Sequence, residues 1–225
     1  MPNDWIASTS TTASCCWRPR RIDSVDVGTT LGVVKCAPLF LPESTIVAVE
    51  DVATTCGPVA ELEVFRAKRV GLVAPRERLR GGAFDRTQAA LSEALSWYGS
   101  TLGPVVGADA SVQALTAAYH EVRRDGAELV LAAGASATDP LDSVFEGLRH
   151  AGGEVLQIGI PVEPGTACWI GHLDSIPVLG LASCELIGRP GALDLLLPRL
   201  LIDERLDRRL LRSLACRGLL LGPHA

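Results

Sequence analysis

The residues best suited to chemistry lie in one short loop, between Gly134 and Asp142. An apolar run, Leu129–Ala133, ends at Gly134-Ala135-Ser136, and the loop that follows carries polar side chains at Ser136, Thr138, Asp139 and Asp142. Small residues let a backbone approach a phosphate closely, and a serine hydroxyl can donate a hydrogen bond to it. A strand, a small-residue turn and a helix in this order are typical of α/β sheets that present N–H groups to an anion. The alternative is a tight turn in which small residues serve packing alone.

The two aspartates of this loop have different expected roles. Asp139 precedes Pro140, which disfavours a helical conformation for the residue before it. We therefore expect the Asp139 carboxylate to face a ligand or to hold Mg²⁺, because hard cations prefer carboxylate oxygens. Asp142 precedes an apolar pattern with helical spacing, where the helix dipole stabilises an acidic residue. For Asp142, helix capping and ligand binding are equally supported.

Two further segments present polar groups beside rigid or helical backbone. Glu163-Pro164-Gly165 places a carboxylate before a turn, because proline fixes φ and glycine permits positive φ. Asp85-Arg86-Thr87 opens an apolar helical pattern, and a helix N-terminus with an arginine can bind phosphate. The alternatives are an ordinary turn at Glu163 and a helix cap at Asp85.

Strand-like and helix-like segments alternate around these loops. The sequence predicts strands at Val70–Ala74, Pro104–Gly107, Leu129–Ala133 and Val155–Ile160, and a hairpin of Ala167–Gly171 with Ile176–Leu181. It predicts helices at Asp85–Tyr98, Asp109–Arg124, Leu141–His150, Leu193–Leu201 and Leu206–Leu214. Such alternation is typical of an α/β fold: a three-layer, mostly parallel sheet with helices on both faces and an antiparallel hairpin at its edge.

The pattern divides the chain into three parts. We expect residues 1–21, rich in Ser and Thr, to form a disordered tail without a secretory signal. Residues 22–66 form a small strand-bearing segment packed on the main domain, which spans 67–225 and includes the C-terminal helices. Within the small segment the sequence predicts strands at Gly32–Cys36, Ile46–Val49 and Glu61–Phe65 and a short helix at Glu50–Thr55.

Composition limits the classes of partner. The net charge of −5 favours neither nucleic acid nor an anionic membrane surface, and no apolar run approaches the roughly 20 residues of a membrane span. The seven cysteines form no Cys-x-x-Cys pair, so they predict a reducing cytoplasm rather than a zinc site. We expect a cytoplasmic protein that binds a small molecule and neither nucleic acid nor membrane.

Several motifs in one order resemble the molybdopterin-binding domain of molybdenum-cofactor biosynthesis proteins. Ala133-Gly134-Ala135-Ser136 is similar to that family's Gly-Gly-x-Ser or Gly-Ala-Ser loop, with Asp139 and Asp142 in its acidic loop. Pro161-Val162-Glu163-Pro164-Gly165 is similar to its Pro-Val-Asp-Pro-Gly element, and Pro177–Leu181 to its Pro-Val-x-Gly-Leu strand. The resemblance covers residues 69–200 and is closest to the module often fused to a cytidylyltransferase-like domain, where Asp85-Arg86-Thr87 matches a Lys-Thr loop.

The resemblance implies a pterin ligand and a set of contacts. The cofactor would be molybdopterin, with Mg²⁺ and molybdate as further ligands, and the partners would be other molybdenum cofactor proteins or molybdoenzymes and a second copy of this chain. Asp139 would be the metal ligand and catalytic residue. The cofactor-binding residues would be Gly134, Ala135, Ser136, Asp139, Asp142, Glu163, Pro164, Gly165, Asp85 and Thr87.

Two departures from the family pattern bear on catalysis. Ala182-Ser183 stands where the family has Pro-Gly, and Ala74–Leu79 keeps only Glu77 and Leu79 of its acidic Thr-Gly-Asp-Glu-Leu element. Carboxylates that would hold a metal or molybdate are therefore partly missing. This favours a binding module for cofactor synthesis, storage or hand-over. The alternatives are a Mg²⁺-dependent molybdotransferase or nucleotidyltransferase, and a diverged domain that only mediates association.

Overall fold

The computed structural model describes residues 25, 28, 30, 40–56, 62–79, 81–183, 185–187 and 191–215. The chain divides into two units, Met1–Glu63 and Val64–Ala225, and each is described by itself. The tail predicted over residues 1–21 and the strand predicted at Gly32–Cys36 lie outside the described residues. None of the described helices is long and apolar enough to cross a bilayer.

The N-terminal unit contains helix α1 (Glu43–Cys56). The helix predicted at Glu50–Thr55 is confirmed, but the strand predicted at Ile46–Val49 is wrong because those residues belong to the same helix. The helix begins after Pro42, whose carbonyl accepts from the Thr45 amide. The negative charge of Glu43 in the first turn interacts favourably with the positive end of the helix dipole. Ile46 and Val49 are about half exposed, at 48% and 47%, so they are not the buried face that the strand interpretation required.

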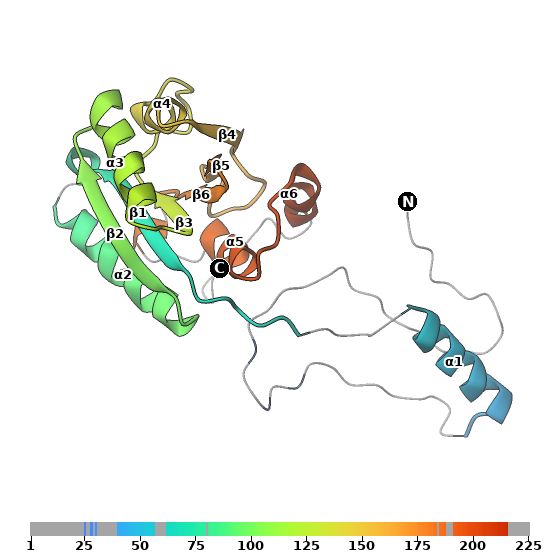
Figure 1. Cartoon of the computed structure of the whole chain (residues 1–225). Helices are drawn as coiled ribbons and strands as arrows, with labels where there is room; N and C mark the ends of the chain where they lie inside the picture. Colours follow the sequence, from blue (N-terminus) through green and yellow to red (C-terminus); the bar gives the residue numbers. More distant parts are fainter. Residues whose placement is uncertain are drawn as a thin grey trace. The chain divides into compact units, whose positions relative to one another are not determined.

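The C-terminal unit is built on a six-stranded sheet. Its strands are β1 (Arg69–Pro75), β2 (Thr101–Ala108), β3 (Leu129–Ala132), β4 (Gly153–Ile158), β5 (Trp169–Leu173) and β6 (Ile176–Gly180). Their order is β2-β1-β3-β6-β5-β4, which can be followed across the view in Figure 1. The pairs β1–β2, β1–β3 and β3–β6 are parallel, and β5 is antiparallel to both of its neighbours. The mostly parallel sheet and its antiparallel hairpin are thus confirmed.

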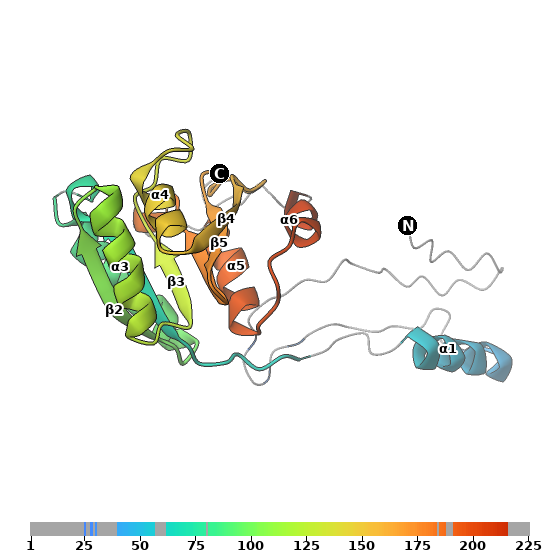
Figure 2. The ribbon, with the colours of Figure 1, turned by 45° about the horizontal axis from the view of Figure 1, so that its top comes forward.

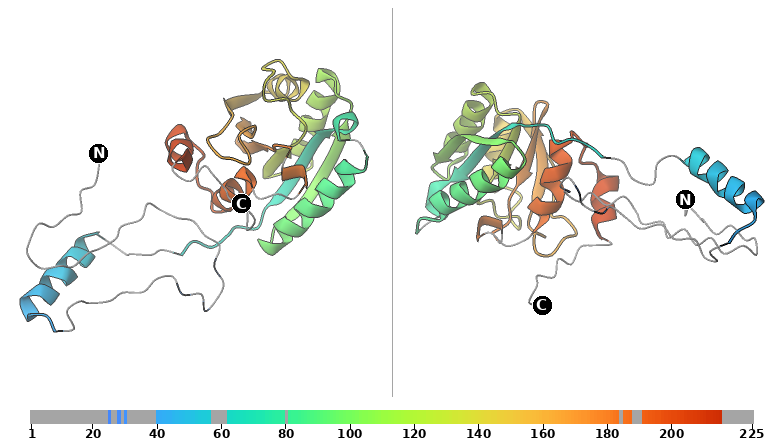
Figure 3. Two further views of the ribbon diagram at one scale, coloured as in Figure 1. Left: turned by 180° about the vertical axis from the view of Figure 1, so that it is seen from behind. Right: turned by 90° about the horizontal axis from the view of Figure 1, so that it is seen from below.

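Helices cover both faces of this sheet, as Figure 1 and the reverse view in Figure 3 show. Helices α2 (Ala83–Trp97) and α5 (Ala192–Leu201) pack on one face through a core that includes Leu72, Leu95, Leu131 and Leu196. Helices α3 (Val112–Arg124) and α4 (Ser143–His150) pack on the other face, side by side in Figure 2. Helix α6 (Arg208–Leu214) follows α5, and two short 3₁₀ segments lie at Arg76–Arg78 and Glu185–Ile187.

The predicted boundaries shift where the helix caps differ from those expected. Helix α2 begins at Ala83 after Gly82, which has a φ of 73°, so Asp85 lies in the first turn and is not the cap. Helix α3 is capped by Ser111, whose side chain accepts from the Ala114 amide, and not by Asp109. The segment from Leu62 to Lys68 contains no strand. There the Arg66 amide donates to the Leu201 carbonyl at the end of α5, so the strand predicted at Glu61–Phe65 is wrong over its described residues.

Trp169 fixes the hairpin against the rest of the sheet. The indole is completely buried and meets the Phe145 ring edge to face at 5.1 Å between centroids. The indole also lies directly on Gly180 at the end of β6, where an added Cβ would overlap the ring. Because Gly180 pairs with Trp169 across the hairpin, the close approach holds β5 and β6 in register.

Gly180→Ala should therefore destabilise the protein by about 1–3 kcal/mol, the usual range for an overpacked core. Gly107→Ala is the matched control, because the three atoms nearest to an added Cβ there all belong to the side chain of Arg76, an exposed residue that can move. Chemical denaturation of both variants measures the difference. A Gly180→Ala protein as stable as the wild type would show that the indole packing does not hold the hairpin.

Candidate functional site

The predicted loop lies where the chain changes from one face of the sheet to the other. After β1 the chain continues to α2 on one face, whereas after the adjacent strand β3 it continues to α4 on the opposite face. In open α/β sheets, the crevice outside the carboxyl ends of two such strands is the usual place for a ligand. Gly134, with a φ of 76°, turns the chain there. The topology thus places Gly134-Ala135-Ser136 at the carboxyl end of β3, the position in this sheet that most favours ligand binding.

An arginine from the β1 side joins this loop. The Arg78 guanidinium donates to the Gly134 carbonyl at 3.0 Å, to the Asp142 carboxylate at 2.6 Å and to the Ser143 hydroxyl at 3.0 Å. The Asp142 side chain is 3% exposed and that of Arg78 is 33% exposed. The two segments that follow β1 and β3 are therefore tied together by a mostly buried ion pair.

Asp142 is the N-cap of α4 and also a support for the loop. Its Oδ1 accepts from the Val144 amide at 2.8 Å, and its Oδ2 accepts from the Ser136 amide at 3.1 Å. Burial raises the pKa of the nearby Tyr119 hydroxyl, and the negative charge of Asp142 raises it further. With Arg78 as its third partner, Asp142 has no accessible oxygen to offer a ligand. Its predicted capping role is present in the structure, whereas a direct contact with a cofactor would require the network to open.

The groups left at the surface of the loop are small and polar. The Ser136 and Thr138 hydroxyls lie 3.1 Å apart, and both residues are exposed. Within the described residues, the amides of Gly134 and Ala135 donate no hydrogen bond to the protein. Two hydroxyls and two backbone N–H groups form a neutral donor set suited to phosphate oxygens.

Asp139 is exposed in the middle of the loop, but it is not wholly free. Its Oδ1 accepts from the Leu141 amide at 2.9 Å, which closes a local turn of the kind aspartate commonly forms. The other carboxylate oxygen has no hydrogen-bond partner among the described residues. Asp139 can therefore contribute one oxygen to a ligand while the other holds the turn.

Magnesium fits this loop only together with an anionic ligand. Nowhere in the described ranges do three or more His, Cys, Asp or Glu side chains gather in a way that could hold a metal. Asp139 is the single accessible carboxylate of the loop, since Asp142 is occupied. Mg²⁺ commonly binds through one or two carboxylates plus substrate phosphates, and only that arrangement suits the residues present.

The Glu163-Pro164-Gly165 segment also lies at the end of the sheet where the parallel strands have their carboxyl ends, but far from β3. It follows β4, which is three strands away from β3, or about 14 Å at the usual strand spacing. The exposed Glu163 carboxylate accepts from the Thr166 hydroxyl at 2.6 Å. Gly165 packs on α5, where an added Cβ would lie 2.7 Å from Ala192 Cβ. The segment is therefore held in place by these contacts, at a distance from the loop between Gly134 and Asp142, which we call the Ser136 loop.

The Asp85-Arg86-Thr87 segment does not present the surface that was expected. Thr87 is 1% exposed, and its hydroxyl donates to the Leu186 carbonyl at 3.3 Å. The Arg86 guanidinium donates to the Gly81 carbonyl, which leaves Asp85 as the exposed group in the first turn of α2. Thr87 serves packing between α2 and the segment after β6, because the helix starts at Ala83 and turns position 87 inward.

Sequence reasoning missed two residues that shape this edge. Arg78 lies in the Ala74–Leu79 segment, which keeps only part of the family's acidic element, and its partner Asp142 is 64 residues away in the sequence. Glu185 is 7% exposed and accepts from the Leu193 amide at 2.6 Å, the Ala182 amide at 2.9 Å and the Cys168 thiol at 2.9 Å. Burial raises the pKa of Glu185, although these hydrogen bonds lower it. The only sequence signal for Arg78 was the cluster of arginines directly after β1.

Removing the cation from the Arg78–Asp142 pair should destabilise the domain. Arg78→Ala leaves a buried carboxylate without its charged partner, which should cost about 1–3 kcal/mol after allowance for partial exposure. Arg123→Ala is the control, because Arg123 pairs with Asp174 at an exposed site, where an ion pair contributes about 0–1 kcal/mol. Urea denaturation should rank the two variants in this order; the reverse order would contradict a structural role for Arg78.

A second stability test concerns Glu185. Glu185→Ala removes the common acceptor of two backbone amides and one thiol, so we expect a loss of about 2 kcal/mol or more. Glu154→Ala, at an exposed position of the edge strand β4, should change the free energy of unfolding by less than about 0.5 kcal/mol. Equal melting temperatures for the two variants would show that Glu185 does not support α5.

Comparison with known proteins gives a partial structural similarity. The molybdopterin biosynthesis protein MoeA from Pyrococcus horikosii matches 62% of this chain with a TM-score of 0.41 and 21% sequence identity. The match spans 37% of that protein's length. No protein-family model and no curated protein matches the sequence. The similarity concerns the arrangement of the α/β fold over part of the chain, and it assigns no ligand.

Proposed function

We propose that this chain binds molybdopterin or its metal-loaded form, with the phosphate end of the ligand at the Ser136 loop. The observation that carries the proposal is the place of Gly134-Ala135-Ser136 at the switch point between β1 and β3. The family-like motifs in the sequence supply the identity of the ligand. The exposed hydroxyls of Ser136 and Thr138 and the adjacent amides supply the donors that a phosphate requires.

The other predicted residues have different roles in this proposal: some contact the ligand, and others only position the loop. Asp139 offers one carboxylate oxygen to a Mg²⁺ ion that arrives with the phosphate. Glu163-Pro164-Gly165 contacts the pterin end of a ligand that lies along the edge of the sheet. Asp142 and Arg78 position the loop without touching the ligand, because their charged groups are bonded to each other.

We favour a binding module over a complete catalyst. Two residues of the segment after β1 are already committed to the fold: Arg78 bonds to Asp142, and Glu77 accepts from the Ala110 amide at 2.9 Å. A metal-inserting or nucleotidyl-transferring enzyme would need further carboxylates near Asp139. Molybdenum cofactor proteins or molybdoenzymes would receive the ligand, and a second copy of the chain would complete an oligomer.

Titration of the purified chain with molybdopterin, with and without Mg²⁺ and molybdate, tests this function. A binding module should take up molybdopterin and insert molybdate slowly or not at all. Efficient Mg²⁺-dependent production of active cofactor would establish the enzyme in its place. Failure to bind the pterin, with self-association in sedimentation experiments, would support the association domain.

Ser136→Ala should weaken molybdopterin binding by about 1 kcal/mol or more, the usual contribution of a hydrogen bond to a charged group. Stability should change little, because among the described residues the Ser136 hydroxyl hydrogen-bonds only to that of Thr138. Ser96→Ala, which removes an exposed hydroxyl from α2, should leave the affinity unchanged. Both affinities are to be measured at one salt concentration, and equal values would remove Ser136 from the site.

Asp139→Asn and Asp142→Asn should have opposite effects. Asparagine at position 139 can still accept from the Leu141 amide, so the melting temperature should hold while the affinity for ligand or Mg²⁺ falls. Asparagine at position 142 can accept from Val144, but its NH2 group then replaces Oδ2 and loses the bonds from both Arg78 and the Ser136 amide, so the melting temperature should fall. Thermal melts and one titration on each variant decide this. A lower melting point with intact binding for Asp139→Asn would make the loop purely structural.

A further inference from the structure

A hollow of about 390 Å³ opens on the β4 side of the domain, away from the Ser136 loop. Its lining residues are Gln157, Gly159, Pro161, Arg208, Leu211 and Arg212. Two strands, β6 and β5, lie between β4 and β3, so the hollow is apart from the Ser136 loop. Its size falls within the usual range for small-molecule sites.

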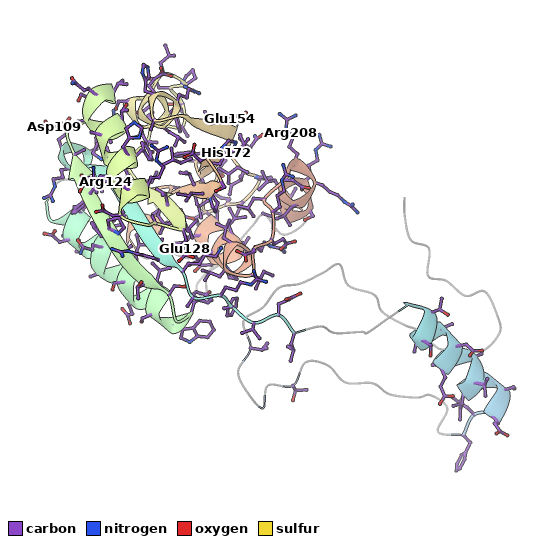
Figure 4. All side chains as sticks on the ribbon, viewed as in Figure 1. Asp109, Arg124, Glu128, Glu154, His172 and Arg208 are labelled. Atoms are coloured by element: carbon purple, nitrogen blue, oxygen red, sulfur yellow. The ribbon has the colours of Figure 1, made fainter. Side chains whose placement is uncertain are left out.

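Two arginines of α6 line the same hollow. Arg208 and Arg212 are four residues apart on a helix, which puts both on one face with their Cβ atoms roughly 6 Å apart. Figure 4 labels Arg208 on α6. Leu211, 4% exposed, anchors the helix between them. Because this helix is packed on the domain, the guanidinium groups are presented from a fixed base.

Neither arginine has a carboxylate partner in the part of the chain that the structure describes. Glu204 and Asp207, which are close to Arg208 in the sequence, are already bonded within the fold. Glu204 pairs with Arg199 at 2.7 Å, the Asp207 side chain caps α6 through the Leu210 amide, and Glu154 lies 3.4 Å from His172 Nε2. The last two residues are labelled together in Figure 4. A chain with a net charge of −5 thus keeps two unpaired cations at the edge of one hollow.

We propose that this hollow binds the diphosphate group of a small phosphorylated metabolite through Arg208 and Arg212. A guanidinium binds phosphate oxygens through two parallel N–H donors. Two guanidiniums one helical turn apart can each take one phosphoryl group of a diphosphate. The overall negative charge of the chain opposes a long polyanion, which favours a small occupant. This site does not depend on the function proposed for the Ser136 loop.

Pyrophosphate is the probe for this site, and the amide signals of Gln157 and Gly159 in ¹⁵N-labelled full-length protein are the local readout. Addition of pyrophosphate should shift these signals saturably. The affinity obtained from the shifts should be higher for pyrophosphate than for inorganic phosphate. The Arg208→Ala/Arg212→Ala double variant should bind roughly tenfold more weakly or worse, as expected for the loss of charge-assisted hydrogen bonds. The affinity of each single variant for pyrophosphate should lie between that of the double variant and that of the wild type.

Arg209→Ala is the matched control, because Arg209 is exposed on the same helix but does not line the hollow. It removes the same charge and should leave the affinity unchanged. Ser136→Ala should also leave these two signals unaffected, which separates this site from the Ser136 loop. Unshifted Gln157 and Gly159 signals in the wild type, or equal weakening by Arg209→Ala, would overturn the proposal. Tighter binding of a single-stranded oligonucleotide than of pyrophosphate would overturn it as well.

Discussion

The ion pair of Arg78 with Asp142 is the contact on which the candidate site depends. One carboxylate caps α4, holds the Ser136 amide and neutralises an arginine from the segment after β1. The loop between β3 and α4 therefore has its shape fixed from both sides of the switch point. A loop of small residues without such a support would lose conformational entropy on binding a ligand. With this support, the Ser136 and Thr138 hydroxyls are already in place.

A second buried carboxyl group, that of Glu185, likewise joins separate segments, on the other face of the sheet. Glu185 follows β6, accepts from the Leu193 amide in the first turn of α5, and receives the Cys168 thiol from the loop before β5. Both carboxylates stand next to helix N-termini, where the dipole favours negative charge. The carboxyl ends of the strands are thus supported by two buried carboxyl groups, whose oxygens accept hydrogen bonds within the fold.

The balance of charge differs between the two sites. At the Ser136 loop the basic group Arg78 is bonded internally, so the binding that we propose there would rest on neutral donors and on a cation that the ligand brings. At the hollow beside α6, Glu204 and Asp207 have their own partners, and our proposal assigns Arg208 and Arg212 to an anion. In both proposals local pairing, and not the net charge of −5, decides where an anion would bind.

The sequence by itself determined the alternation of strands and helices in the C-terminal unit, the hairpin, and the small-residue loop after β3. These are local signals: apolar periodicity, glycine at turns and aspartate before a helix. It misjudged Ile46–Val49, because β-branched residues favour strands, whereas here they belong to helix α1. It also predicted Thr87 as a cofactor-binding residue, whereas the start of α2 at Ala83 turns that side chain inward.

Only the tertiary structure decided which loops meet. The strand order β2-β1-β3-β6-β5-β4 brings Arg78 to Asp142 and keeps Glu163 three strands away from Ser136. It also leaves Arg208 and Arg212 beside the carboxyl end of β4. The physical reason is that strand order depends on long-range packing of both faces, whereas periodicity and caps depend on neighbours within a few residues. The residues able to do chemistry can be read from the chain, but their partners depend on the sheet.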